Sequence, residues 1–131
     1  MKKNQQGSAL LEALISILIF SMGILANVGL QSAMIKDSIN SQYRAEAAFL
    51  SNELLGIIWS DKNSLSSYAI AAGQTTSTYP LASTWLTKVQ QTLPAGAPIV
   101  AINGSEVTIT VTWKKGNEAM HQYSISSNVT P

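Results

Sequence analysis

The hydrophobic and polar residues divide the chain into four segments. Residues 1–7 are polar and basic, and residues 8–30 are almost uniformly apolar. In residues 31–60 apolar residues recur with helical spacing, and residues 61–131 contain short periodic runs separated by turn residues. We therefore expect a polar extension, a helix long enough to span a membrane, an amphipathic continuation of that helix, and a small folded head.

The apolar segment contains one charged residue. Ser8 to Leu30 spans 23 residues, of which only Glu12 is charged. A helix of this length is about 34 Å long, and the hydrocarbon core of a bilayer is about 30 Å thick. Lys2 and Lys3 precede it, so the positive-inside bias places the N-terminus in the cytoplasm and the rest of the chain on the other side. This predicts a single-pass membrane protein whose head lies outside the cytoplasm.

Glu12 leaves three interpretations of this segment open. A secretory signal peptide normally has an apolar core of about 7–15 residues, shorter than this one. A plain signal anchor has the right length but no use for a carboxylate. At the centre of a membrane helix a carboxylate costs about 3 kcal/mol, and less near the interface. The third interpretation is therefore a functional Glu12 that has a specific partner.

The segment after the membrane span continues the helix. No proline occurs between Ser8 and Asp61. Apolar residues recur at steps of three and four and line one face: Ile39, Tyr43, Ala47, Leu50, Leu54 and Ile57. The pattern predicts one helix from about Ser8 to about Trp59, roughly 78 Å long. Its apolar half contains three residues that lower helix stability, Gly23, Asn27 and Gly29. Their presence indicates either close helix packing or a stretch that loosens outside lipid.

The C-terminal segment predicts loops, a helix and three strands. We expect a loop with one short helical turn from Asp61 to Pro80. A helix follows from Ser83, as its N-cap, to Leu93, with Trp85, Leu86, Val89 and Leu93 on one side and Pro94 as its stop. The expected strands are Ile99–Ile102, Glu106–Trp113 and Ala119–Ser127, joined by turns at Asn103-Gly104 and Lys114–Glu118.

The alternation in Glu106–Trp113 gives the predicted sheet one apolar face, formed by Val107, Ile109, Val111 and Trp113. Thr108, Thr110 and Thr112 form the other face, which we expect to be exposed to solvent. An apolar sheet face needs a cover, and the helix from Tyr43 to Trp59 can provide it. The predicted fold class is therefore α+β, with a long N-terminal helix packed on a small antiparallel sheet.

Composition and charge narrow the function. The chain has 8 Lys+Arg and 7 Asp+Glu, a net charge of +1, which gives no basic stripe for nucleic acid. It has no cysteine and one histidine, His121, so we expect no disulfide, metal site or cofactor. No Gly-rich phosphate loop or nucleophile-elbow motif is present. We expect no catalytic residues and no enzyme activity.

The junction Gly7-Ser8-Ala9-Leu10-Leu11-Glu12 resembles the cleavage site of type IV prepilins. The resemblance implies that residues 1–7 are a leader, cut after Gly7 by a prepilin peptidase that also methylates the new N-terminus at Ser8. Most members of that family have Phe at the position of Ser8. The resemblance also implies that Glu12 pairs with the N-terminal amine of a neighbouring subunit. Leader removal takes away Lys2 and Lys3 and leaves 8 − 2 = 6 Lys+Arg against 7 acids.

Three further stretches resemble the PilV-type minor pilins, namely Gly23–Gln31, Tyr43–Ala48 and Asn52–Leu55. That resemblance implies a long helix on a small sheet and a role in priming or modifying a type IV pilus. The implied partners are the major pilin, other minor pilins, the inner-membrane assembly platform and, before assembly, membrane lipid. The alternatives are a minor pseudopilin of a type II secretion system and, from another class, a signal-anchored periplasmic enzyme or sensor.

Overall fold

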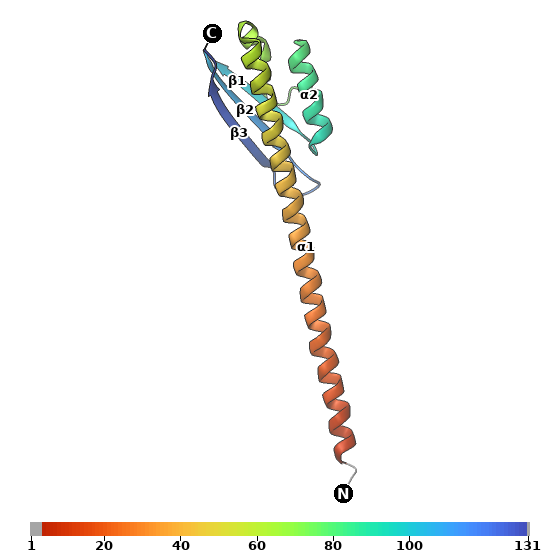
Figure 1. Ribbon diagram of the computed structural model, residues 1–131. Helices are drawn as coiled ribbons and strands as arrows, with labels where there is room; N and C mark the ends of the chain where they lie inside the picture. The colour runs from red at the N-terminus through yellow and green to blue at the C-terminus, as the bar shows by residue number, and fades with distance from the viewer. Residues whose placement is uncertain (1–3, 131) are drawn as a thin grey trace. The chain divides into compact units, whose positions relative to one another are not determined.

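A computed structural model describes residues 4–130, with side-chain environments from residue 7 onward. Its elements are α1 (Asn4–Ser60), the short 3-10 helix η1 (Lys62–Tyr68), α2 (Pro80–Thr92), β1 (Ala97–Asn103), β2 (Glu106–Trp113) and β3 (His121–Asn128) (Figure 1). The first three residues of the expected leader lie outside the described residues. The chain forms two compact units, which divide within α1 after Asn40.

The first unit consists of helix alone, from the start of α1 to Asn40. The single long helix predicted from Ser8 to Trp59 is confirmed, because α1 runs without interruption for 57 residues. Its polar side chains bond within the helix: the Ser21 hydroxyl donates to the Ile17 carbonyl at 2.7 Å. The Gln31 amide donates to the Asn27 side-chain oxygen at 3.2 Å. Such local bonds satisfy polar groups without water, as a membrane helix requires.

The second unit is built on a three-stranded antiparallel sheet in the order β1-β2-β3. The predicted alternation in β2 is confirmed, because Val107, Ile109, Val111 and Trp113 are all buried. Neighbouring strands extend this apolar face, since Ile109 lies opposite Val100 on β1 and Ile125 on β3. The C-terminal part of α1 and all of α2 cover that same face (Figure 1). This is the predicted α+β arrangement, and one core holds it together.

The C-terminal part of α1 contributes a buried stripe to this core. Ala47, Leu50, Leu54 and Ile58 are at most 1% exposed, and they follow the helical repeat of 3.6 residues. At the end of the predicted stripe Ile57 packs against the core but is only half-buried, whereas Ile58, which was not predicted, is fully buried. A step of four from Leu54, rather than three, keeps the side chain over the sheet. The buried Trp85 of α2 donates its indole N–H to the Leu50 carbonyl at 2.8 Å, which ties the two helices together.

The start of α2 differs from the prediction. Ser83 is not the N-cap, because the helix begins at Pro80 with Tyr79 in the capping position. The Ser83 amide already donates to the Tyr79 carbonyl at 2.8 Å, as a residue in the first turn does. Proline suits the first helical position, since its fixed φ fits the helix and its missing N–H would have no partner there. Pro80 therefore starts this helix instead of ending the preceding loop.

The remaining predicted elements are present with shifted ends. The helical turn expected between Asp61 and Pro80 is η1. The turn at Asn103-Gly104 joins β1 to β2, and Gly104 has φ of +62°, a conformation that favours glycine. β1 is longer than predicted at both ends, and β3 begins at His121 rather than Ala119. Thr108, Thr110 and Thr112 lie on the outer face of the sheet, where they are half-exposed.

Candidate functional site

The residues of the predicted processing site lie together on α1. Gly7 and Ser8 are adjacent, and Glu12 follows Ser8 by four residues, so Ser8 and Glu12 share one face of the helix. All three are exposed. A protease approaching the bond between Gly7 and Ser8 would meet no covering segment among residues 7–130.

The fold itself does not require glycine at position 7. A Cβ atom placed there would have nothing within 4 Å. The positive-φ glycines of the described residues are Gly73, Gly104 and Gly116, so Gly7 has no conformation that demands it either. A glycine in a helix costs about 1 kcal/mol relative to alanine. Packing and backbone conformation among the described residues therefore give no reason for a glycine at this position.

The apolar segment of α1 is uncovered over its whole length. Every residue from Gly7 to Ser38 is exposed, and the large apolar side chains between Leu10 and Ile35 are 48–71% exposed. This helix is long and apolar enough to cross a membrane, and its most apolar 18-residue window has a mean hydropathy of 2.3. A signal sequence meets the same criterion. Because exposure of such a surface to water is strongly disfavoured, it must contact lipid or another protein.

Glu12 is the one charged side chain between Ser8 and Leu30. No cation among residues 7–130 lies within salt-bridge distance of its carboxylate. Transfer of an isolated carboxylate into an apolar environment is strongly disfavoured, whereas a close opposite charge offsets much of that cost. The structure thus leaves an acceptor for a positive group on a surface suited to lipid or protein contact.

A second cluster lies after the end of α1, and nothing in the sequence pattern pointed to it. The Asp61 carboxylate accepts hydrogen bonds from the hydroxyls of Tyr68 at 2.9 Å, Ser64 at 3.1 Å and Tyr79. The rings of Tyr68 and Tyr79 meet edge to face, with centroids 4.9 Å apart. The Tyr79 and Tyr68 hydroxyls hold the pKa of Asp61 below its usual value. Burial and the nearby Asp61 raise the pKa of Tyr68, so both tyrosines act as donors that fasten this loop.

The lone histidine has a packing contact. His121 stacks on the Trp113 ring across β2 and β3, with ring centroids 5.8 Å apart and planes 18° apart. Among residues 4–130 no three His, Cys, Asp or Glu side chains gather closely enough to hold a metal ion. His121 thus contributes an aromatic surface at this end of the sheet.

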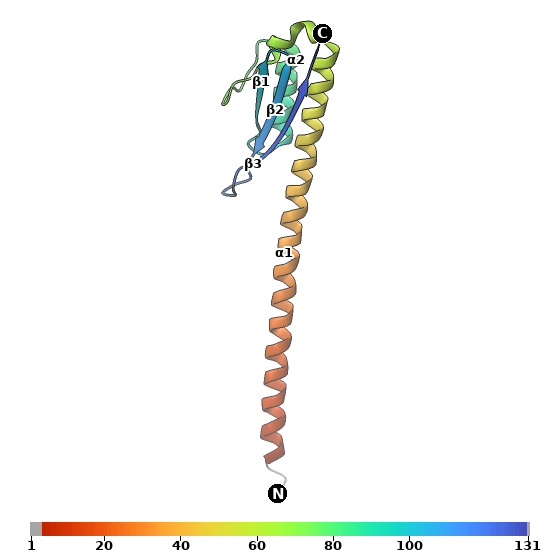
Figure 2. The same ribbon diagram turned by 90° about the vertical axis from the view of Figure 1, so that its left-hand side faces the viewer.

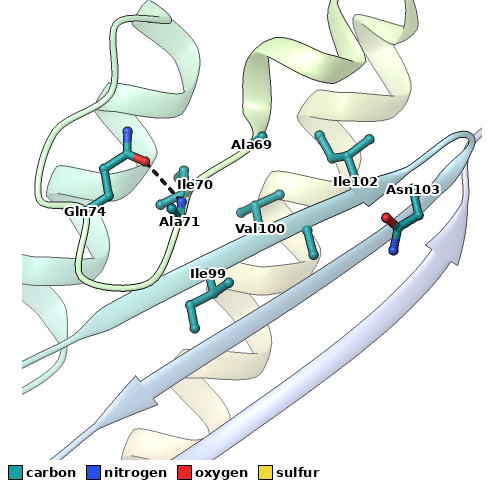
Figure 3. A pocket seen from close by; sticks show the side chains of 9 residues that line it. Ala69, Ile70, Ala71, Gln74, Ile99, Val100, Ile102 and Asn103 are labelled. Carbon is teal, nitrogen blue, oxygen red and sulfur yellow. Dashed lines mark hydrogen bonds between the residues drawn. The ribbon is translucent and has the colours of Figure 1, made fainter.

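A hollow of about 490 Å³ lies beside β1, and Figure 3 shows its lining. The segment from Ala69 to Gln74 forms one wall and Ile99 to Asn103 the other. The Gln74 side-chain oxygen accepts the Ala71 amide at 3.0 Å and holds the loop in its turn. The lining is mainly aliphatic and contains no titratable side chain, so it offers no group for acid–base chemistry.

Comparisons with protein-family models, with curated proteins and with solved structures found no match for this chain.

Proposed function

We propose that this chain is a minor pilin of the PilV type, incorporated into a type IV pilus or priming its assembly. Prepilin peptidase cuts the precursor after Gly7 and methylates the new N-terminus at Ser8. Residues 8–30 hold the chain in the inner membrane, with its head in the periplasm, until the subunit enters the filament. The role is structural and needs no catalytic residue.

One observation carries this proposal: an uncovered apolar helix with one carboxylate a single turn from the proposed new N-terminus. Cleavage after Gly7 creates a cationic amine on Ser8 and removes Lys2 and Lys3. In a filament, that amine from one subunit pairs with Glu12 of its neighbour inside an apolar environment. Any other axial register leaves both charges unpaired at a cost of several kcal/mol, so the pair sets the register as well as the affinity.

The proposal is tested by Glu12→Ala in cells that assemble the filament. Without the carboxylate, the precursor is still cut after Gly7, but the mature chain fails to enter filaments or to co-assemble with other pilins. Asp37→Asn is the matched control, because it removes an exposed carboxylate of the same helix outside the apolar segment. Normal incorporation of Glu12→Ala would contradict the pairing. Gly7→Leu should instead leave the precursor uncut.

A minor pseudopilin of a type II secretion system is the closest alternative, because the same anchor and the same carboxylate serve both systems. Deletion of the gene separates them: loss of twitching motility supports the pilus, and loss of enzyme export supports the secretion system. A signal-anchored enzyme or sensor predicts a mature N-terminus at Met1 or beyond residue 20. N-terminal sequencing of the mature chain excludes or supports it directly.

A further inference from the structure

The two edges of the sheet differ in whether their backbone groups are satisfied. At the β1 edge, Ile70 and Val100 exchange two backbone hydrogen bonds of 3.0 Å each, and Pro98 has no N–H to offer. The loop that contains Ile70 therefore occupies the middle of this edge. Ile102 is the residue of β1 whose outward N–H has no such cover.

The β3 edge is open. Antiparallel strands direct their backbone groups alternately to either side, so Val100, which bonds Ile70, fixes the pattern across the sheet. By the register of the strands, Tyr123 and Ile125 bond to β2. Gln122, Ser124 and Ser126 consequently direct their N–H and C=O groups away from the sheet. Within residues 4–130 no backbone or side-chain group bonds to them on that side.

This open edge lacks the usual protection against strand addition. Exposed edges are normally blunted by charged residues, proline, a bulge or a short strand. β3 is 8 residues long and contains no Lys, Arg, Asp, Glu or Pro. An edge of this length without such features is suited to accept another strand.

We propose that β3 receives a single β-strand from another polypeptide, in which hydroxyl residues alternate with β-branched apolar residues. β2 is a strand of this kind and already pairs with β3. The Ser126 and Ser124 hydroxyls lie 2.8 and 2.9 Å from those of Thr108 and Thr110. Each serine hydroxyl still has hydrogen-bonding capacity for a hydroxyl on its open side.

The inner face of β3 supports the same chemistry. Tyr123 and Ile125 pack against the core but remain half-exposed at the edge of the sheet. Apolar residues of an added strand would lie beside them and complete their burial. Charged residues on the inner face of an added strand are disfavoured, since they would be desolvated there without a partner.

The direction of β3 limits how a second copy of this chain could pair with it. β3 runs in the same direction as residues 41–60 of α1, as both views show (Figures 1 and 2). Antiparallel pairing of two β3 strands would reverse that helix segment in the second copy. Antiparallel pairing is therefore excluded for two copies whose residues 41–60 run in the same direction.

The test uses the purified full chain in detergent micelles, with a peptide of the sequence of residues 106–113 flanked by lysines as the probe. Amide hydrogen exchange followed by NMR should slow about tenfold or more at Ser124 and Ser126 when the peptide is added. The amides of Tyr123 and Ile125, already bonded to β2, should not change. Unchanged exchange at Ser124 and Ser126, or equal protection at Ile102, would overturn the assignment to β3.

Two variants separate the backbone from the side chain. Ser124→Pro removes the outward N–H without removing a bond to β2, and should weaken peptide binding at least about tenfold. Ser124→Ala keeps that N–H and should weaken binding about threefold or less. Equal binding by Ser124→Pro and wild type would contradict strand addition. If the chain without peptide protects Ser124 and Ser126 in a concentration-dependent way, a second copy occupies the edge and the proposal is wrong. None of these outcomes depends on pilus assembly.

Discussion

The two halves of α1 share a helical backbone but differ in whether their apolar side chains are buried by the same chain. Residues 41–60 bury Ala47, Leu50, Leu54 and Ile58 against a sheet supplied by the same chain. Residues 8–30 bury nothing, although they are more apolar. The difference teaches that an amphipathic stripe finds its partner within the fold, whereas a helix that is apolar all round requires a partner from outside.

The comparison predicts that the same truncation lowers the free energy of unfolding strongly in one half of α1 and hardly at all in the other. Leu54→Ala should lower the free energy of unfolding of the head by about 2–5 kcal/mol, because it empties a buried position. Leu14→Ala is the matched control and should change it by less than about 0.5 kcal/mol. Denaturant unfolding in detergent, followed by Trp fluorescence, measures both. Equal effects would show that the halves are not distinct.

The hydrogen bond between α2 and α1 predicts the next largest effect. Trp85→Phe keeps an aromatic ring in the core but removes the donor to the Leu50 carbonyl. We expect a loss of about 1–3 kcal/mol in the free energy of unfolding. Trp59→Phe is the control, because Trp59 lies on α1 and is 39% exposed, so its replacement should lower the free energy of unfolding far less. A loss that matches the control would mean that the bond contributes nothing.

Substitution of a glycine in the apolar half tests whether this stretch loosens outside lipid. A Cβ at Gly23 would meet nothing within 4 Å, so Gly23→Ala should stabilise the local helix by about 1 kcal/mol. If the stretch from Gly23 to Gly29 loosens on leaving lipid, its amides should exchange faster in filaments than in detergent, and Gly23→Ala should reduce that difference. Equal protection in the two environments would exclude loosening and leave close helix packing as the role of these glycines.

The smallest effect is the pH dependence at Asp61. Its hydrogen bonds hold its pKa below the ordinary value of 3.8 in the folded state, so they stabilise the head above that pH. This stabilisation should be lost as the pH falls through the lower, folded-state pKa. Unfolding curves between pH 7 and about 2 should show a steeper acid loss for wild type than for Asp61→Asn. Glu106→Gln is the control, and an Asp61→Asn profile identical to wild type would contradict the role of the cluster.

The fold was largely predictable because its strongest signals are periodic. β2 alternates without a break, and both of its predicted ends are confirmed. Prediction was less accurate where the sequence allows two outcomes. Pro80 can start a helix or end a loop, and the core position after Leu54 can fall on Ile57 or on Ile58. The Asp61 cluster was missed because its partner Tyr79 is 18 residues away in a segment without periodicity.

The residues of the candidate site could be named from the sequence because they lie close together in it. Gly7, Ser8 and Glu12 are neighbours in sequence on one exposed helix, so folding brings no distant residue to them. The resemblance to prepilins singles out these three residues, and the structure adds that nothing in residues 7–130 covers them. The open edge of β3 required the structure, because the sequence shows a strand but not its place in the sheet.

The N-terminal mass of the chain recovered from assembled filaments tests the central proposal most directly. The account predicts a mature chain that begins at Ser8, carries one added methyl group on its amine, and lacks residues 1–7. A chain that still begins at Met1 within finished filaments would contradict it, because Glu12 would then have no N-terminal amine to pair with.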